Sequence, residues 1–310
     1  NMRRLFSVVM LLAVAMSATA AKPKFEIKHV EPLSWWVGMT TPLQIMVNGE
    51  GVSAYDVTIL PEKQGVEVTK VHKADSPNYI FVDVAIAKDA KADVYRLCFS
   101  DGKRKYEYEY EYEYVIAERR ADSKYRESFT NADLVYLIMP DRFANGNPEN
   151  DSTDDTAEKA QRSHPGRRHG GDLEGMMAHL DYIADLGATA IWSTPLLLDN
   201  ENGASYHGYS CSDYYLIDPR FGSNELFKEY VEECHKRDLK VIMDIVPNHS
   251  STTHWWYADQ PFADWTHQWD RYTQSNWTFS TNMDFNASKS DLYQMESGWF
   301  DRSMADMNLD

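Results

Sequence analysis

The hydrophobic pattern of this 310-residue chain changes its period between residues 119 and 128. Upstream, short runs such as LQIMV, YDVTIL and IFVDVAI alternate apolar and polar residues and are separated by Gly, Asp, Pro or Ser clusters. Alternation with period two is typical of strands that bury one face. We therefore predict an antiparallel β-sandwich over residues 21–118, followed by a polar linker, RRADSKYRES, over residues 119–128.

Beyond the linker, the patterns typical of strands and helices alternate. ADLVYLIMP, ATAIWSTPLL and KVIMDIVPNH have the composition of buried strands, whereas DLEGMMAHLDYIADLG and NELFKEYVEECHKRDL place apolar residues at helical spacing. The order strand, helix, strand, helix, strand indicates a parallel sheet over residues 129–250. Such a sheet can be doubly wound or closed into a barrel, and periodicity does not decide between them. The fold class is thus multidomain, β followed by α/β.

Residues 251–310 lose this periodicity and are rich in aromatic residues, six of which are Trp255, Trp256, Trp265, Trp269, Trp277 and Trp299. Structureless loops of this length are uncommon inside compact domains. We therefore expect a small inserted subdomain here.

The run YEYEYEYEYV at residues 106–115 places every Tyr on one face of a strand and every Glu on the other. We interpret it as an amphipathic strand whose aromatic face points to the core of the sandwich. The alternative is a tyrosine platform for sugar rings.

The N-terminus predicts secretion. Arg3 and Arg4 precede an apolar run and the small residues Ala18, Thr19 and Ala20, which is the pattern of a signal peptide over residues 1–20. We expect a periplasmic location and no membrane insertion, because the apolar run is too short to span a bilayer. With 48 acidic and 31 basic residues, the chain carries a net charge of −17, which disfavours nucleic acid as a partner.

Two features indicate a functional site in the second half. Asp244, Asn248 and His249 end the third strand, and His207, Tyr209 and Asp213 follow the second, so both groups are expected at one edge of the sheet. The acidic stretch RFANGNPENDSTDD at residues 142–155 follows the first strand and is either a disordered linker or a metal site.

Several motifs resemble the α-amylase superfamily, glycoside hydrolase family 13, and within it the neopullulanase/cyclomaltodextrinase branch. YHGYSCSDYYLIDPRFG, DIVPNH and MADMN occur in family order, with Ala305 where the family usually has Pro. VEPLSWWVGM and SPNYIFVDV resemble the sandwich domain that precedes the barrel in this branch. The resemblance implies the first part of a (β/α)₈ barrel, with the inserted subdomain of residues 251–310 after strand 3 and the chain ending before strand 4.

The resemblance implies a hydrolase of α-1,4-glucosidic bonds in pullulan, cyclomaltodextrins or maltodextrins, with a retaining mechanism. The family's Asp nucleophile and Glu general acid lie after barrel strands 4 and 5, so we expect no catalytic carboxylate within residues 1–310 and a longer whole protein. Tyr209 would stack on the glucose next to the cleaved bond, and His207 and His249 would donate hydrogen bonds to its hydroxyls. Asp244 and Asn248 would support the floor of the site.

The resemblance also favours a metal site over a linker. Asn145, Asn147, Asn150 and Asp151 would supply oxygens to Ca²⁺, and the carbonyl of Gly170 and the carboxylate of Asp172 would complete about six ligands. The intervening STDDTAEKAQRSHPGRR is expected to be mobile. The expected ligand is an α-glucan oligosaccharide, and the sandwich is a possible homodimer contact. The alternative is a non-catalytic α-glucan-binding or scaffold protein of the same superfamily.

Overall fold

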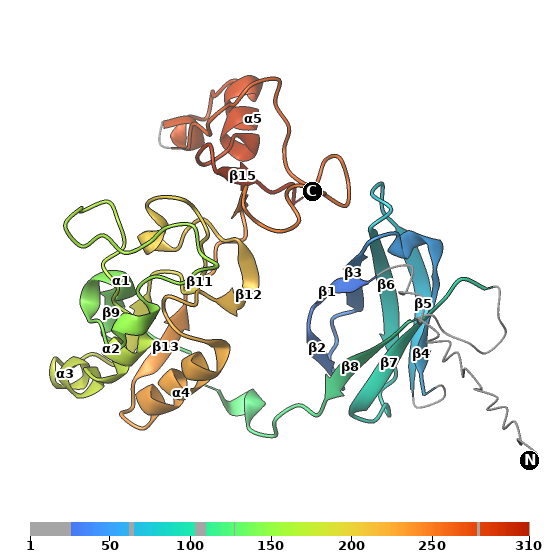
Figure 1. Cartoon of the computed structure of the whole chain (residues 1–310), viewed down its shortest axis with the longest axis horizontal. Helices are drawn as coiled ribbons and strands as arrows, with labels where there is room; N and C mark the ends of the chain where they lie inside the picture. The colour runs from blue at the N-terminus through green and yellow to red at the C-terminus, as the bar shows by residue number, and fades with distance from the viewer. Residues whose placement is uncertain (1–25, 62–64, 103–109, 127, 278–279, 310) are drawn as a thin grey trace, which may run out of the picture. The chain divides into compact units, whose positions relative to one another are not determined.

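The computed structural model describes residues 26–61, 65–102, 110–126, 128–277 and 280–309. The predicted signal peptide over residues 1–20 lies outside the described residues. The chain divides into two compact units, the first made of residues up to 119 except 74–76 and the second mainly of residues 120–310 (Figure 1).

The first unit contains two four-stranded sheets, ordered β1-β3-β6-β5 and β2-β8-β7-β4 (Figure 1). Neighbouring strands are antiparallel, except that β2 runs parallel to β8. The elements are β1 (Ile27–Glu31), β2 (Ser34–Trp36), β3 (Leu43–Gly49), η1 (Val52–Ala54), β4 (Asp56–Leu60), β5 (Val66–Lys73), β6 (Tyr79–Ile86), β7 (Asp93–Ser100) and β8 (Tyr110–Ala117). Residues from both sheets form one buried apolar core, so the unit is a sandwich.

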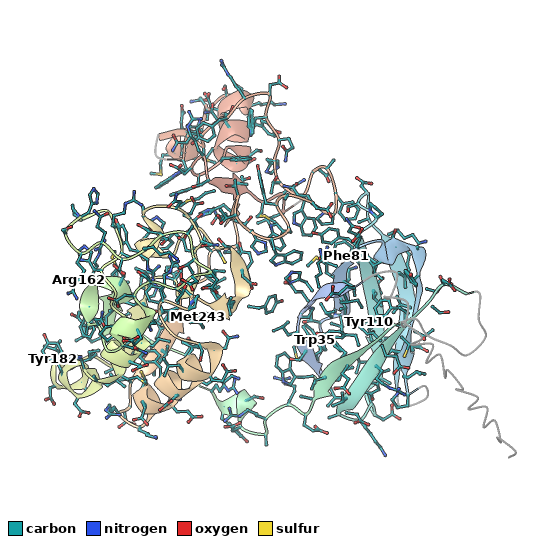
Figure 2. The ribbon with its side chains drawn as sticks, viewed as in Figure 1. Trp35, Phe81, Tyr110, Arg162, Tyr182 and Met243 are labelled. Atoms are coloured by element: carbon teal, nitrogen blue, oxygen red, sulfur yellow. The ribbon has the colours of Figure 1, made fainter. Side chains whose placement is uncertain are left out.

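The Tyr/Glu strand is an amphipathic strand in its described part. Tyr114 is fully buried, and Tyr110 and Tyr112 pack against the same core, as Trp35 does (Figure 2). Glu111 and Glu113 are exposed. The aromatic face therefore points inward, which confirms the core interpretation for these residues. Residues 106–109 lie outside the described residues.

The second unit is built on a parallel sheet ordered β13-β10-β9, in which Ile191 lies between Tyr136 and Val241. Its three strands are β9 (Val135–Ile138), β10 (Ala190–Ser193) and β13 (Lys240–Met243). Four helices accompany them, namely α1 (Pro140–Phe143), α2 (Leu173–Met177), α3 (Leu180–Asp185) and α4 (Asn224–His235). Apolar residues of α2, α3 and α4 pack with residues of all three strands, including Met243 of β13 (Figure 2).

The sheet follows the predicted strand and helix order, but the first predicted helix differs. The predicted helix over residues 172–187 is divided into α2 and α3, because His179 leaves helical backbone angles and its Nδ1 lies 2.7 Å from the carbonyl of Gly175. Helix α4 is capped by Ser223, whose hydroxyl accepts from the N–H of Leu226 at 3.1 Å. Asn224, the first residue of the helix, bonds the backbone of Ile217 and Tyr215.

The remaining elements of this unit are short. They are η2 (Ser123–Tyr125), η3 (Pro148–Asn150), β11 (Leu197–Leu198), η4 (Ser205–His207), β12 (Asp213–Ile217), β14 (His249–Ser251), η5 (Ser280–Met283), α5 (Lys289–Ser297) and β15 (Met304–Asp306). Strand β14 pairs with β15 antiparallel, which ties the aromatic-rich segment beyond residue 251 to the end of the third strand. Among the described residues, none of the helices is both long and apolar enough to cross a bilayer.

Candidate functional site

Tyr209 and Asp244 meet at the carboxyl-terminal edge of the parallel sheet. The hydroxyl of Tyr209 donates to Oδ2 of Asp244 at 3.3 Å, and the indole N–H of Trp192, on β10, donates to the same oxygen at 3.0 Å. Burial, followed by the charge of Asp244, raises the pKa of Tyr209. The tyrosine is therefore a neutral ring whose orientation is set by a carboxylate from the neighbouring strand end.

His207 is held as one tautomer beside this ring. Its Nδ1 accepts from the backbone N–H of Tyr209 at 3.0 Å, so the ring proton lies on Nε2. The two rings are 5.9 Å apart between centroids. Burial lowers the pKa of His207, which favours the neutral form. A neutral imidazole that carries its proton on Nε2, next to an aromatic ring, is suited to bind a hydroxyl group.

His249 has a different environment. It is only 3% exposed, and its ring stacks on Phe300 with centroids 5.1 Å apart. The side-chain amide of Asn248 lies 2.9 Å from Nδ1, and Nε2 lies 2.9 Å from the carbonyl of Tyr209. Both ring nitrogens thus have protein partners, so His249 supports the backbone of Tyr209 in this structure. Its direct contact with a sugar hydroxyl stays a prediction.

Asn248 lies between this site and the aromatic-rich segment. Its backbone carbonyl accepts from the N–H of Met307 at 2.9 Å. It also lines a cavity of about 330 Å³ together with Trp277, Phe300 and Asp306. Of the strand-end residues expected from the sequence, Asp244, Asn248, His249, His207 and Tyr209 are therefore brought together by direct contacts. Asp213 instead begins β12 and accepts from the N–H of Tyr215 at 2.8 Å.

The turn that presents His207 and Tyr209 needs unusual backbone angles. Ala204 has φ +59°, in the left-handed region that favours glycine. Gly208 has φ +77°, and a Cβ at this position would lie 2.2 Å from the carbonyl oxygen of Pro195. Glycine is thus required at 208, whereas Ala204 is strained.

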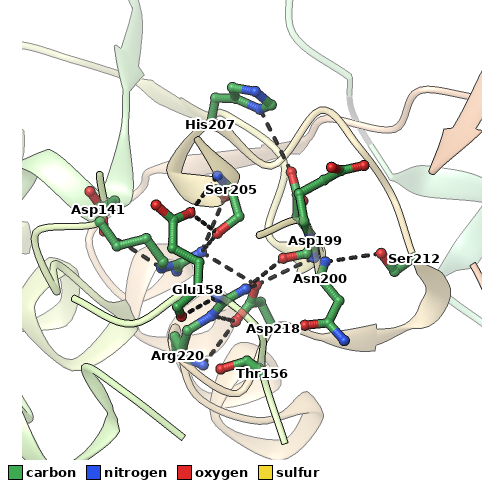
Figure 3. A network of polar contacts seen from close by, with 12 residues as sticks. Asp141, Thr156, Glu158, Asp199, Asn200, Ser205, His207, Ser212, Asp218 and Arg220 are labelled. Atoms are coloured by element: carbon green, nitrogen blue, oxygen red, sulfur yellow. Dashed lines mark hydrogen bonds and ion pairs between the residues drawn. The ribbon is translucent and has the colours of Figure 1, made fainter. Parts of the chain in front are cut away.

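A buried ionic network lies behind this turn (Figure 3). Arg220 donates to both carboxylate oxygens of Asp218 and to the carbonyl of Asp199. Burial raises the pKa of Asp218, but Arg168 and Arg220 outweigh it, so the pKa of Asp218 is lowered. Burial raises the pKa of Asp199 well above its ordinary value. Oδ2 of Asp199 lies 3.7 Å from Nδ1 of His207, which connects the network to the candidate site.

Parts of the segment between the acidic loop and α2 belong to this network, so the expectation that residues 152–168 are mobile does not hold for Thr156, Glu158 and Arg168. Thr156, Glu158 and Arg168 are all buried. The N–H of Ala157 donates to the side chain of Asn200 at 2.8 Å, and Arg220 donates to the carbonyl of Glu158 at 2.9 Å. Buried charges are stable only when paired, and these contacts fix the segment in place.

Short contacts join five of the six predicted calcium ligands into two groups, Asn147 with Asp172, and Asn145 with Asp151 and Gly170. The N–H groups of Gly146 and Asn147 donate to the carboxylate of Asp172 at 3.0 and 2.8 Å. The side chain of Asn145 donates to Asp151 at 2.6 Å. A Cβ at Gly170, which has φ +88°, would lie 2.4 Å from Oδ1 of Asp151. The acidic loop therefore lies against the start of α2, as expected.

The predicted ligands differ in how readily they could bind a metal. Oδ1 of Asn145 and Oδ1 of Asn150 are buried and have no hydrogen-bond partner among the described residues. Oδ1 of Asn147 accepts from the N–H of Glu149 at 3.1 Å. Asp172 also caps α2 by accepting from the N–H of Gly175 at 2.7 Å, a role that the sequence analysis missed.

Asp151 lies close to other negative charge. Burial raises its pKa, and so do the charges of Asp172 and Asp141, while the hydrogen bond from Asn145 opposes the shift. In the described part of the chain, no group of three or more His, Cys, Asp or Glu side chains is arranged to hold a metal ion. The available donors are therefore mainly amide oxygens with Asp151, a set that suits a hard cation.

Sequence reasoning missed Trp192, Asp199 and Glu158. Trp192 lies near the end of β10, and Asp199 follows the end of β11. Asp244 was identified because it lies at a strand end, and the same criterion could have identified these two residues. Glu158 lies in a polar run without periodicity, and nothing in the sequence distinguishes it from Asp154 or Asp155.

Two family models match this chain. Residues 137–306 match the family model "Alpha amylase, catalytic domain", and residues 29–120 match "Cyclomaltodextrinase, N-terminal". A cyclomaltodextrinase from Geobacillus thermopakistaniensis is 29% identical over 253 residues, which cover 78% of this chain and 39% of that protein. Neopullulanase 2 from Thermoactinomyces vulgaris is 40% identical over 132 residues, which cover 42% and 20%.

Among solved structures, an α-amylase from Anoxybacillus is 38% identical, with a TM-score of 0.45, over 57% of this chain and 34% of that chain. The chain spans less than half the length of each of these relatives.

Proposed function

Because this chain belongs to the α-amylase family, and within it to the neopullulanase/cyclomaltodextrinase branch, we propose that the whole protein is a secreted, periplasmic glycoside hydrolase. It would cleave α-1,4-glucosidic bonds of pullulan, cyclomaltodextrins or maltodextrins with retention of configuration. Residues 129–250 would form the first part of a (β/α)₈ barrel, and residues 251–310 an inserted subdomain after strand 3.

The arrangement of Tyr209, His207 and Asp244 supports this function best. A pyranose ring offers an apolar C–H face to an aromatic ring and a rim of hydroxyls to hydrogen-bond donors. Asp244 orients the ring of Tyr209, and the tautomer of His207 places a donor on Nε2. One sugar could therefore stack on Tyr209 and bind His207 through a hydroxyl.

The bond-breaking groups would come from elsewhere in the whole protein. Retention requires an ionised nucleophile and a protonated acid about 5 Å apart. Asp244 is poorly suited to be the nucleophile, because Tyr209 and Trp192 both donate to its Oδ2. Hydrogen bonds to a carboxylate stabilise its charge and lower its nucleophilicity. The family resemblance assigns both catalytic carboxylates to positions after Asp310.

Kinetics on the whole protein test the proposal. Hydrolysis of pullulan, β-cyclodextrin and maltotriose would be measured by reducing-end release, and NMR would give the anomeric configuration of the first product. An α-product supports retention. Binding of β-cyclodextrin without release of reducing ends would favour the alternative, a non-catalytic glucan-binding protein of the same superfamily.

We also propose that Asn145, Asn147, Asn150, Asp151, Gly170 and Asp172 hold Ca²⁺. The buried Oδ1 atoms of Asn145 and Asn150, which lack a partner among the described residues, fit this ion, as does the negative charge around Asp151. The ion would cross-link the acidic loop to the start of α2. It would act on stability and leave the chemical step to other groups.

Two further parts of the proposal concern partners. The α-glucan would be the ligand, and the sandwich would be the contact surface of a homodimer. Sedimentation analysis of the whole protein and of a variant without residues 21–118 tests the second point, because the deletion should convert a dimer to a monomer.

A further inference from the structure

Glu158 holds the turn on which the candidate site depends. Its Oε2 accepts two hydrogen bonds from Ser205, one from the backbone N–H and one from the hydroxyl, both at 2.7 Å (Figure 3). Ser205 begins the 3₁₀ turn η4, which ends at His207. Glu158 is 2% exposed and is separated from Ser205 by 47 residues. A carboxylate from a remote loop thus caps the turn.

Arg168 binds the backbone carbonyl of Ser205. Its Nη1 donates to the carbonyl of Ser205 at 3.1 Å. The backbone N–H and C=O of Ser205 are therefore bound by two buried charged side chains from one loop. The turn also has its own backbone bond, from the N–H of Gly208 to the carbonyl of Ser205 at 3.2 Å, and the two charged side chains add support from outside it.

The turn needs such support. Ala204, immediately before Ser205, has φ +59°. A residue with a Cβ is strained in this region and persists there only where its surroundings fix it. The two bonds from Ser205 to Glu158 involve the next residue along the chain. They add to the bond from the N–H of His207 to the carbonyl of Ala204, so they help to hold Ala204 in this conformation.

The geometry of the turn is transmitted directly to the site. His207 is the last residue of η4, and its Nδ1 accepts from the N–H of Tyr209 only when the chain reverses at Gly208. Asp199 lies between β11 and η4. Its Oδ2 lies 3.7 Å from Nδ1 of His207 and accepts from the N–H of Ser210 at 3.2 Å. A shift at Ser205 would therefore move the ring of His207 and change its tautomer.

We infer that Glu158 is a positioning residue of the site, acting through Ser205 to fix the orientation and tautomer of His207 and the placement of Tyr209. The expected effect on kcat/KM rests on the proposed function, whereas the expected effect on His207 does not. Glu158 touches neither ring, and its effect on turnover is indirect. Loss of alignment by about 1 Å can reduce kcat/KM by about 100-fold.

The test compares three variants of the whole protein. Glu158→Ala removes the acceptor, and we expect kcat/KM for maltodextrin to fall about 10- to 100-fold. Glu158→Gln keeps one acceptor oxygen and should restore most of this loss. Asp155→Asn alters an exposed carboxylate of the same loop and should leave the kinetics unchanged. If Glu158→Ala does not fold, Ser205→Ala, which removes the hydroxyl bond to Glu158, is measured in its place: a fall in kcat/KM supports the inference, and an unchanged kcat/KM overturns it.

A double-mutant cycle separates positioning from general damage. In a His207→Ala, Tyr209→Ala background the turn has nothing left to position, so Glu158→Ala should reduce the residual kcat/KM by less than about 3-fold. Equal losses in both backgrounds would overturn the inference.

A spectroscopic measurement is independent of turnover. In the ¹⁵N spectrum, His207 should be the Nε2–H tautomer in wild type and a mixture in Glu158→Ala. An unchanged His207 signal would overturn the inference. If wild type hydrolyses no α-glucan, the proposed function fails, while this signal still decides whether Glu158 positions His207.

Discussion

Replacement of Asp151 by Asn should have opposite effects on stability with and without calcium. In the metal-free protein, burial and the charges of Asp172 and Asp141 all disfavour the ionised form of the carboxylate. A neutral amide avoids this repulsion, and Asp151→Asn preserves the size of the side chain and its bond from Asn145. We therefore expect the variant to have a higher Tm than wild type in EGTA.

Calcium reverses the order. At a free concentration of 100 times Kd, a ligand that binds only the native state stabilises it by about 2.7 kcal/mol. For a domain of 150–250 residues, 1 kcal/mol corresponds to roughly 2–4 °C, so the Tm of wild type should rise by roughly 5–10 °C. Asp151→Asn removes one of the two carboxylates among the proposed ligands and should lose most of this increase.

The pH dependence has a defined sign. The pKa of Asp151 is higher in the native state than its ordinary value of 3.8, so the native state binds the proton more tightly than the unfolded state. The associated stability is complete below pH 3.8 and is lost as the pH rises through the raised pKa. Without calcium, the Asp151→Asn variant should not lose stability over this pH range, because its side chain does not titrate.

Differential scanning calorimetry at several pH values, in EGTA and in CaCl₂, measures these quantities. Asp155→Asn, at an exposed position, is the control and should follow wild type throughout. A drop in Tm of equal size for Asp151→Asn in both solutions would refute the reasoning, because it would make Asp151 a structural acceptor unrelated to a metal.

Three other predictions follow from the site. Tyr209→Ala should lower kcat/KM of the whole protein about 100-fold by removing the stacking ring, whereas Tyr209→Phe should cost about 10-fold or less because only the bond to Asp244 is lost; equal losses would contradict stacking. Ala204→Gly should raise the Tm by roughly 2–4 °C, since relief of the φ strain exceeds the entropic cost of glycine; an unchanged or lower Tm would show that the turn is unstrained. The 310-residue chain alone should release no reducing sugar from pullulan, and turnover abolished by Asp244→Asn would show that the catalytic centre was misassigned.

The parts of the fold that follow from periodicity could be predicted from the sequence. Period-two runs indicated the sandwich strands and the inward face of Tyr110, Tyr112 and Tyr114. The helix between the first two parallel strands was predicted without its break, because the break depends on a bond between His179 and the carbonyl of Gly175. Hydrophobic spacing is insensitive to such a side-chain bond.

The residues of the candidate site that lie at strand ends could be predicted, but the contact that supports the turn could not. The rule that strand ends meet at one edge brought Tyr209 and Asp244 together. The bond from Glu158 to Ser205 joins residues 47 positions apart through a polar loop. Such a contact is determined by the path of the loop in three dimensions, for which a single sequence offers no periodic signal.

The charge balance behind the turn explains why this loop is constrained. Asp141, Glu158, Asp199 and Asp218 are buried together with Arg168 and Arg220, so the carboxyl groups outnumber the guanidinium groups. The raised pKa of Asp199 reduces the imbalance, because it favours the neutral acid. Removing one partner of a buried ion pair typically costs about 3–5 kcal/mol, since the other charge stays buried. Glu158 and Arg168 are therefore restricted by the network as well as by the turn, while Asp154 and Asp155, exposed in the same loop, are free to vary.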